Sequence, residues 1–365
     1  MGWRDSINQN LAQSNSLTIE LSDPKSQYVL PGTVLSGHVV VRPVKPLTVG
    51  SLCITLYGIS DAHILRQIGT IQNHFFGRGF LFQEIQTVAT GPLTLEPIDG
   101  GSSAYRYPFS FTVPETTRSM KENTANVINK WKPKPPFLGA EEMHPLPPRL
   151  ESKGKSPFGF HESTVSYRLD ATCEKTKGGT SPMWLPQMAK DVQFFPVRAQ
   201  QMPDIGSRPL TSQPHSLKSR QQFSFIIELP SIAYPGGPFP LRVGQSGVTG
   251  LRLTSLEVKL QGRLVTRGRN ILFGDKVAEE KKEVTVANWA NLDLPLAPEL
   301  GTLQATVPQG IIPTFRSFTV ALPEYLVLIK YQVNARSEVV KGEIREGSLH
   351  ILSPISKYGG KSITK

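Results

Sequence analysis

The chain has 365 residues, of which 38% are hydrophobic, and its formal net charge is +11 at pH 7. Because one hydrophobic core rarely covers a chain of this length, two domains are predicted. The sequence has no run of 18 uncharged apolar residues, no apolar N-terminal segment and no basic-helix or aromatic-basic sheet motif. We therefore expect no transmembrane helix, no secretory signal and no nucleic acid as a partner.

The first half of the chain alternates apolar and polar residues with the period of two that is typical of β-strands. Leu17, Ile19 and Leu21 share one face of residues 16–21, and the same alternation recurs in residues 51–58, 106–114 and 163–172. No segment of 12 or more residues has the pattern of an amphipathic helix. These elements predict an N-terminal β-sandwich over residues 16–201.

Residues 74–82 (HFFGRGFLF) hold four phenylalanines. We interpret them as two buried strands that flank a turn at Gly77-Arg78-Gly79, because four exposed phenylalanines would favour aggregation. The alternative is an apolar loop that enters a membrane or a partner.

A segment rich in Pro, Lys, Glu and Ser covers residues 118–163. Such a composition buries too little apolar surface to offset the entropy of ordering, so a mobile insertion is predicted. Within it, Lys130, Pro133 and Pro136 have the spacing of a ligand for an SH3 domain, which is a candidate peptide motif.

The second half repeats the strand pattern after a polar linker, predicted over residues 202–220. Alternating segments occur at 222–230, 253–262, 317–323 and 329–335. They predict a C-terminal β-sandwich over residues 221–355, followed by a basic tail at 356–365. The predicted fold class is all-β, with two tandem immunoglobulin-like sandwiches.

An internal repeat supports this duplication. The segment from Pro31-Gly32 to Gly58 has the same length as the segment from Pro235-Gly236 to Gly262, at an offset of 204. Residues 110–113 (SFTV) match residues 317–320 at an offset of 207, and residues 167–171 (YRLDA) match residues 331–335 (YQVNA) at an offset of 164. On this alignment the first copy carries 43 extra residues.

The two cysteines are predicted to be free thiols. Cys53 lies on the face of its strand opposite to Leu52 and Ile54, whereas Cys173 shares the apolar parity of Leu169 and Ala171. Two unpaired thiols are typical of a reducing compartment, so a cytoplasmic location is predicted.

These motifs, in this order, resemble the arrestin family, and most closely its arrestin-related (α-arrestin) branch. The resemblance covers about 320 residues, roughly from Leu17 to Leu352, and rests on residues 31–58, 107–115, 146–152 and 163–175 in the first half. In the second half it rests on residues 234–243, 253–262 and 314–335.

The resemblance implies a non-enzymatic cytoplasmic adaptor, located at the plasma membrane or endosomes, that binds the cytoplasmic tails of transporters or receptors in trafficking, endocytosis or signalling. Two alternatives are a constitutive coat subunit of the same fold, similar to retromer, and a carbohydrate-binding β-sandwich. The resemblance to arrestin-related proteins also implies a ubiquitin ligase as a partner, but the PPxY motif that recruits such ligases does not occur in this sequence. The related string Leu322-Pro323-Glu324-Tyr325 lies between predicted core strands and is interpreted as structural.

Patterns for catalysis are not found. The seven histidines have no metal-ligand spacing, and no GxSxG or dinucleotide-binding loop occurs. We therefore predict no enzymatic activity, no metal and no cofactor.

Two features predict contact with phosphate or with a membrane. Gly2 lies in the string MGWRDS, which has the form of an N-myristoylation signal. Basic residues near one predicted C-terminal hairpin form either a solvated face or a candidate patch for phosphate or for an anionic membrane surface. They are Arg263, Arg267, Arg269, Lys276, Lys281 and Lys282.

Overall fold

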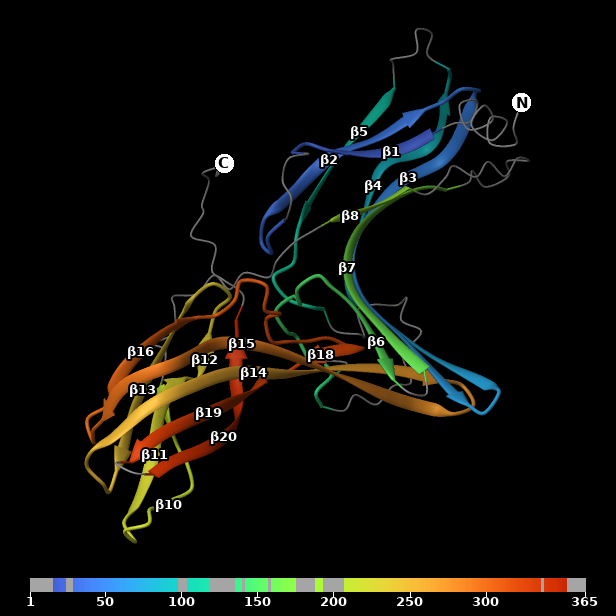
Figure 1. Ribbon diagram of the computed structural model, residues 1–365. Coiled ribbons are helices and arrows are strands. Elements are labelled where there is room, and N and C mark those ends of the chain that lie inside the picture. The colour runs from blue at the N-terminus through green and yellow to red at the C-terminus, as the bar shows by residue number, and fades with distance from the viewer. Residues whose placement is uncertain are drawn as a thin grey trace, which may run out of the picture.

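The computed structural model describes residues 16–23, 29–97, 104–118, 135–139, 142–156, 159–174, 188–192, 207–335 and 338–352. Within these residues the secondary structure is entirely strand, turn and loop, with no helix. The prediction of an all-β protein is confirmed, and the strands form several stacked sheets (Figure 1).

The largest sheet has twelve strands and continues through both halves of the chain. Its central path has the order β12-β20-β19-β14-β4-β3-β7-β6. The strands of this path are β3 (Leu47–Ile68), β4 (Ile71–Leu95), β6 (Leu150–Ser156), β7 (Gly159–Glu174), β12 (Ile232–Ala233), β14 (Leu251–Asn270), β19 (Tyr325–Ala335) and β20 (Glu338–Ile351). The strands that pair beside it are β8 (Met188–Val192), β15 (Gly274–Leu296), β17 (Phe315–Arg316) and β18 (Val320–Leu322).

A smaller sheet is stacked on each end of the large one. In the N-terminal half (β1 to β8) it consists of β1 (Ser16–Leu21), β2 (Val34–Arg42) and β5 (Tyr105–Thr112). In the C-terminal half (β9 to β20) it consists of β9 (Ser207–Thr211), β10 (His215–Ser216), β11 (Gln222–Pro230), β13 (Pro238–Ser246) and β16 (Gly301–Thr306).

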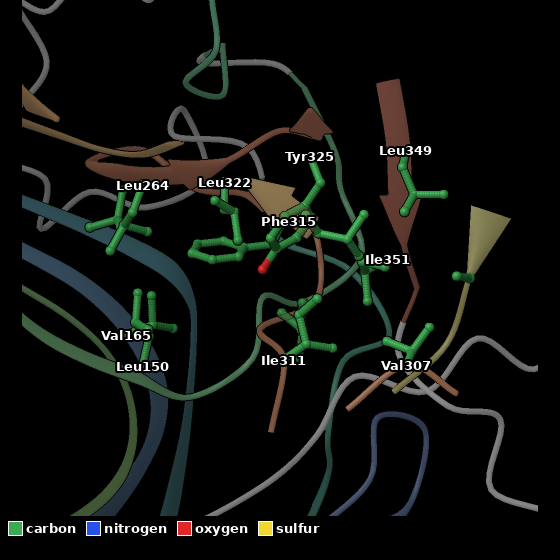
Figure 2. Packing of buried hydrophobic residues seen from close by; sticks show 14 of the residues in the cluster. Leu150, Val165, Leu264, Val307, Ile311, Phe315, Leu322, Tyr325, Leu349 and Ile351 are labelled. Atoms are coloured by element: carbon green, nitrogen blue, oxygen red, sulfur yellow. The ribbon is translucent and has the colours of Figure 1, made fainter. Parts of the chain in front are cut away.

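Alternation along the strands builds the core, because successive side chains point to opposite faces of a sheet. Leu17 and Val39 of the small N-terminal sheet are buried together with Ile54 and Leu56 of the large sheet. The apolar cluster then continues without interruption into the C-terminal half. Figure 2 shows this continuity, with Leu150 and Val165 from the N-terminal half and Leu264, Phe315 and Tyr325 from the C-terminal half.

The two halves each contain a strand glycine that receives a tyrosine ring. A Cβ atom added to Gly58 would lie 2.8 Å from the Tyr167 ring, and one added to Gly262 would lie 2.8 Å from the Tyr325 ring. Each tyrosine hydroxyl donates a hydrogen bond to a loop carbonyl, that of Pro147 for Tyr167 and that of Ile312, at 2.8 Å, for Tyr325. Burial raises the pKa of both phenols. This shared arrangement is the strongest structural sign of duplication.

The strand pairing corrects the alignment of the repeat. Gly58 lies opposite Tyr167 and Gly262 lies opposite Tyr325, which gives an offset of 158 in place of 164. The alignment of Tyr167 with Tyr331 was therefore wrong.

The match between the two SFTV strings was also wrong. Thr112 pairs with Val34 in the first half. The counterpart of Val34 at the offset of 204 is Pro238 in β13, and Pro238 pairs with Thr306. Thr306 is therefore the counterpart of Thr112, at an offset of 194. The second SFTV string belongs instead to a segment between the halves, where the Ser317 carbonyl accepts a hydrogen bond from Leu138 N at 3.0 Å. The insertion between Val113 and Tyr167 is consequently 36 residues longer than its counterpart, not 43.

Three further expectations need correction. The predicted mobile insertion over residues 118–163 contains all of β6 and the start of β7, and residues 135–139 pack against the C-terminal half. The predicted linker over residues 202–220 contains β9 and β10, both of which pair with β11. The Gly77-Arg78-Gly79 turn does not exist, because β4 continues through it, and the hairpin turns at Gly69 and Thr70 instead. The basic tail at 356–365 lies outside the described residues.

Replacing Gly58 or Gly262 by Ala is expected to lower the free energy of unfolding by about 2 kcal/mol, because the new methyl group would overlap a tyrosine ring that is packed on all sides. Urea denaturation would measure the change. The matched control is Gly310→Ala, since no atom lies within 4 Å of a Cβ at that position. Equal effects at all three glycines would show that overlap with the tyrosine ring does not set the cost.

Candidate functional site

The six basic residues predicted to form one patch all lie on the hairpin of β14 and β15, but on two faces of it. Arg263 pairs with Lys281 and Arg269 pairs with Asp275, whereas Lys276 pairs with Gly268 and Lys282 pairs with Gly262. Since side chains of directly paired residues share a face, Arg263, Arg267, Arg269 and Lys281 lie on one face and Lys276 and Lys282 on the other.

Carboxylates accompany four of the six cations. The ion pairs are Arg263–Glu279 at 4.0 Å, Lys282–Glu280 at 2.6 Å, Arg267–Asp275 at 2.5 Å and Arg269–Asp275 at 3.7 Å. Lys276 and Lys281 have no ion pair to a carboxylate in the described part of the chain. The hairpin therefore does not present one uniform basic patch.

Arg267 is a structural residue. It is only 4% exposed, and its guanidinium lies 5.8 Å from the centre of the Phe137 ring. Its backbone N–H donates to the carbonyl of Thr319 at 2.8 Å, and its side chain donates to Asp275. A phosphate group from outside could not reach this guanidinium without displacing these partners.

A different surface arises where two long hairpins end together. The β3–β4 hairpin of the N-terminal half and the β14–β15 hairpin of the C-terminal half reach the same point, at the right of Figure 1. Arg269 pairs with Phe76 across the two hairpins, and the Asn270 side-chain amide donates to the carbonyl of His74 at 2.8 Å. These contacts hold the two turns side by side.

The turns carry exposed apolar side chains, which we call the apolar tip: Ile71, Ile271, Leu272 and Phe273. Ile271 is 99% exposed and Leu272 is 83% exposed, the highest values among the large hydrophobic residues in the described ranges. The Asn270 side-chain oxygen accepts hydrogen bonds from the backbone N–H groups of Leu272 at 2.8 Å and Phe273 at 3.2 Å. The turn is thereby fixed in a form that presents its side chains to solvent.

A pocket of about 630 Å³ lies between the two hairpins beside the apolar tip. Phe75 and Phe273 provide an apolar wall, and Arg66 and Lys276 provide two cations. The sequence analysis did not find this surface. The signal that could have found it is the string Asn270 to Gly274, in which three apolar residues occupy a hairpin turn where polar residues are the rule.

Two histidines lie on the β3–β4 hairpin next to the pocket. His63 Nε2 and His74 Nδ1 are 3.0 Å apart, and the His63 ring stacks on the Phe76 ring with 4.6 Å between centroids. Burial, followed by the neighbouring His74, lowers the pKa of His63. The described residues hold no group of three His, Cys, Asp or Glu side chains that could bind a metal ion.

A clamp joins the insertion to the C-terminal half. The Arg316 guanidinium donates to the carbonyls of Pro136 at 2.7 Å and Phe137 at 3.1 Å, and it forms an ion pair with Glu142. Phe137 and Leu138 are buried at this contact.

The clamp bears on the proposed SH3 ligand. Pro136 is half-buried with its carbonyl bound by Arg316, so this part of the motif is not the free extended loop that the sequence analysis assumed. Lys130 and Pro133 lie outside the described residues, as does Gly2.

A buried polar network also spans the two halves. Ser152 Oγ donates to Glu280 at 2.6 Å, and Lys282 donates to Ser152 at 3.0 Å and to Glu280 at 2.6 Å. His161 Nε2 lies 4.0 Å from Glu280 and has no hydrogen-bond partner among the described residues. Burial lowers the pKa of His161, an effect that Glu280 opposes and Lys282 reinforces.

This histidine predicts a pH dependence of stability. The pKa of His161 is lower in the folded chain than in the unfolded chain. The stabilisation that comes from the neutral side chain is therefore complete above about pH 6.5 and is lost as the pH falls below that value. We expect the free energy of unfolding, from urea denaturation, to fall as the pH is lowered from about 7.5 to about 5.5. His161→Gln should reduce this slope, and His63→Gln should reduce it separately, since the pKa of His63 is lowered too. A slope that neither variant changes would contradict the assignment.

The string Leu322-Pro323-Glu324-Tyr325 is structural, as predicted. Leu322 and Tyr325 are fully buried, and Tyr325 packs against Gly262. A WW domain could not reach this tyrosine in the folded chain.

Both cysteines are free, as predicted, although they lie on adjacent strands. Burial, with a smaller contribution from Cys53, raises the pKa of the Cys173 thiol to about 11. A thiol with this pKa is a poor nucleophile at neutral pH.

In the described ranges, the structure contains no helix with the length and apolar character needed to cross a membrane. Comparison of the sequence with models of known protein families and with curated proteins finds no match.

Proposed function

We propose that this protein is a non-enzymatic cytoplasmic adaptor that binds extended segments, such as the cytoplasmic tails of transporters or receptors, along the outer edge of β15. The observation that carries the proposal is the pairing of this strand. β15 pairs with β14 from Gly274 to Leu296, apart from register shifts at Val286 and at residues 291–293, and with no other strand of the described residues.

An unpaired strand edge offers a row of backbone N–H and C=O groups. An extended segment can add to such an edge as a further strand, with main-chain hydrogen bonds that supply affinity. Charged side chains occupy the edge strand at Glu279, Lys281 and Glu283, which keeps it from pairing with itself in solution. The net charge of +11 favours acidic or phosphorylated tails over basic ones.

We also propose that the chain is related to the arrestin-related proteins. It is supported by the order of the sequence motifs and by the duplicated pairs of a strand glycine and a buried tyrosine, Gly58 with Tyr167 and Gly262 with Tyr325. Two sandwiches of common origin, each with free edges, would suit a scaffold that holds partners without changing them chemically.

Two proline substitutions in the part of the ladder that lies between its two register shifts test the proposal. In an antiparallel pair, consecutive residues direct their N–H groups alternately toward the partner strand and away from it. One of Ala287→Pro and Asn288→Pro therefore removes an N–H from the free edge and keeps the fold, and the other breaks the pairing with β14.

The readout is recovery of transmembrane proteins from detergent-solubilised membranes by the immobilised chain. The wild-type chain should recover such proteins, and the fold-preserving variant should recover markedly less of them. Identical recovery by that variant would exclude the β15 edge, and no recovery by the wild-type chain would count against the adaptor itself.

A further inference from the structure

We infer that the apolar tip inserts into a lipid bilayer that contains anionic headgroups, with the pocket cations contacting lipid phosphates. This inference concerns a different surface from the β15 edge and stands without the proposed adaptor function. It rests on the exposure of the tip, on its rigidity and on the charges beside it.

The exposure of the tip is concentrated at one place. Ile271, Leu272 and Phe273 are consecutive and exposed in one turn, and Ile71 is exposed at the turn of the β3–β4 hairpin, which contacts the same β14–β15 hairpin. Exposed apolar side chains are normally scattered singly over a protein surface, whereas a group of this kind marks an interaction site.

The apolar tip is held in one conformation by hydrogen bonds. Asn270 binds the backbone of the turn through its side-chain oxygen and binds the β3–β4 hairpin through its side-chain nitrogen. Gly274 closes the turn with a φ of +70°, a conformation that favours glycine. The two hairpins are thus locked together with their apolar side chains directed outward.

The charges beside the tip select the lipid. Arg267 and Arg269 share Asp275, so that this trio keeps one positive charge. Arg66 and Lys276, which line the pocket, have no ion pair to a carboxylate in the part of the chain that the structure describes. Arg66 and Lys276 thus place two positive charges in the pocket beside the tip, and cations of this kind are attracted to anionic headgroups.

The shape of the surface favours a bilayer over a protein partner. Ile271 projects almost completely into solvent at the end of a hairpin, so a protein would need a deep apolar cleft to cover it. The interface of a bilayer accepts a convex apolar group of any outline, and basic residues next to such a group add electrostatic attraction.

Flotation of the full chain with vesicles tests the inference. The probes are vesicles of phosphatidylcholine alone and vesicles that also contain phosphatidylserine. The wild-type chain should bind the anionic vesicles and bind the neutral ones much more weakly. The double variant Ile271→Asp, Leu272→Asp should lower the affinity for anionic vesicles by about 100-fold, because two large apolar side chains no longer leave water.

A second double variant separates the roles of charge and apolar contact. Arg66→Gln with Lys276→Gln should lower the affinity for anionic vesicles by about tenfold and leave binding to neutral vesicles unchanged. The matched control is Val339→Asp, which changes an exposed apolar residue near the start of β14, at the opposite end of that strand from the tip. This control should bind vesicles as the wild-type chain does.

Three results would overturn the inference. The first is that the wild-type chain does not bind anionic vesicles. The second is that the Ile271→Asp, Leu272→Asp variant, with its fold intact by circular dichroism, binds these vesicles as tightly as the wild-type chain does. The third is that the wild-type chain binds no vesicles but self-associates, and that this variant abolishes the self-association. The last result would assign the tip to a second copy of the chain. None of these results depends on the recovery of transmembrane proteins through β15.

Discussion

Replacing Asp275 by Asn is expected to lower the free energy of unfolding by about 2 kcal/mol, because it removes a charged hydrogen bond and an ion pair from the buried Arg267. Arg267 is 4% exposed and lies against the Phe137 ring, so water reaches its guanidinium poorly although the Asp275 side chain is 39% exposed. Urea denaturation of the full chain measures this change.

The matched control is Asp293→Asn. Asp293 also forms an ion pair with an arginine, Arg252, but both side chains are largely exposed to solvent. Exposed pairs contribute little because solvent and salt screen them, so this variant should unfold nearly as the wild-type chain does. If Asp275→Asn were equally harmless, Arg267 would have to be hydrated, and a phosphate-binding role for it would become tenable again.

Replacing Arg316 by Ala is expected to release residues 135–139 from the C-terminal half and to lower the free energy of unfolding by about 3 kcal/mol. The side chain donates to two carbonyls and forms an ion pair with Glu142, and hydrogen bonds from a charged group are among the strong ones. Without them, the burial of Phe137 and Leu138 and the hydrogen bond from Leu138 N to the Ser317 carbonyl must hold the segment.

Limited proteolysis with chymotrypsin reports this release directly, since Phe137 is buried while the segment is seated. The Arg316→Ala variant should be cleaved after Phe137 much faster than the wild-type chain. Arg316→Lys should be intermediate because an ammonium group cannot reproduce the fork of a guanidinium. Arg345→Ala, which removes an exposed pair with Glu343, is the control. Unchanged cleavage in Arg316→Ala would show that apolar packing suffices to seat the segment.

The fold class and the identity of the buried strand faces could be read from the sequence. Alternation is a local property with a period of two, and it correctly placed Leu17, Ile19 and Ile54 in the core and Cys53 on the opposite face. The same logic correctly assigned Tyr325 to a structural role, since it lies between two segments with core alternation.

The repeat was recognised, but its alignment failed after the first segment. Four- and five-residue matches such as SFTV and YRLDA are short enough to occur in strands with different partners. Only the pairing of strands showed that β16 is the counterpart of β5 and that Tyr325 is the counterpart of Tyr167.

The insertion was misjudged because composition averages over a segment. Residues 118–163 are polar as a whole, yet Phe137 and Leu138, with the clamp from Arg316, seat residues 135–139 on the C-terminal half. Few apolar residues are needed to order a segment when a long-range contact supplies hydrogen bonds for its backbone.

The sequence by itself determined the strands, the duplicated sheets and the positive charge, because these follow from local alternation and from composition. Only the tertiary structure decided which cations are free, since Asp275 and Glu279 reach their partners through strand pairing. Tertiary structure likewise brought together two hairpins some 200 residues apart, whose turns carry Ile71 and Phe273 of the apolar tip. Contacts between distant segments depend on sheet register and hairpin length, and neither quantity is encoded in any short stretch of sequence.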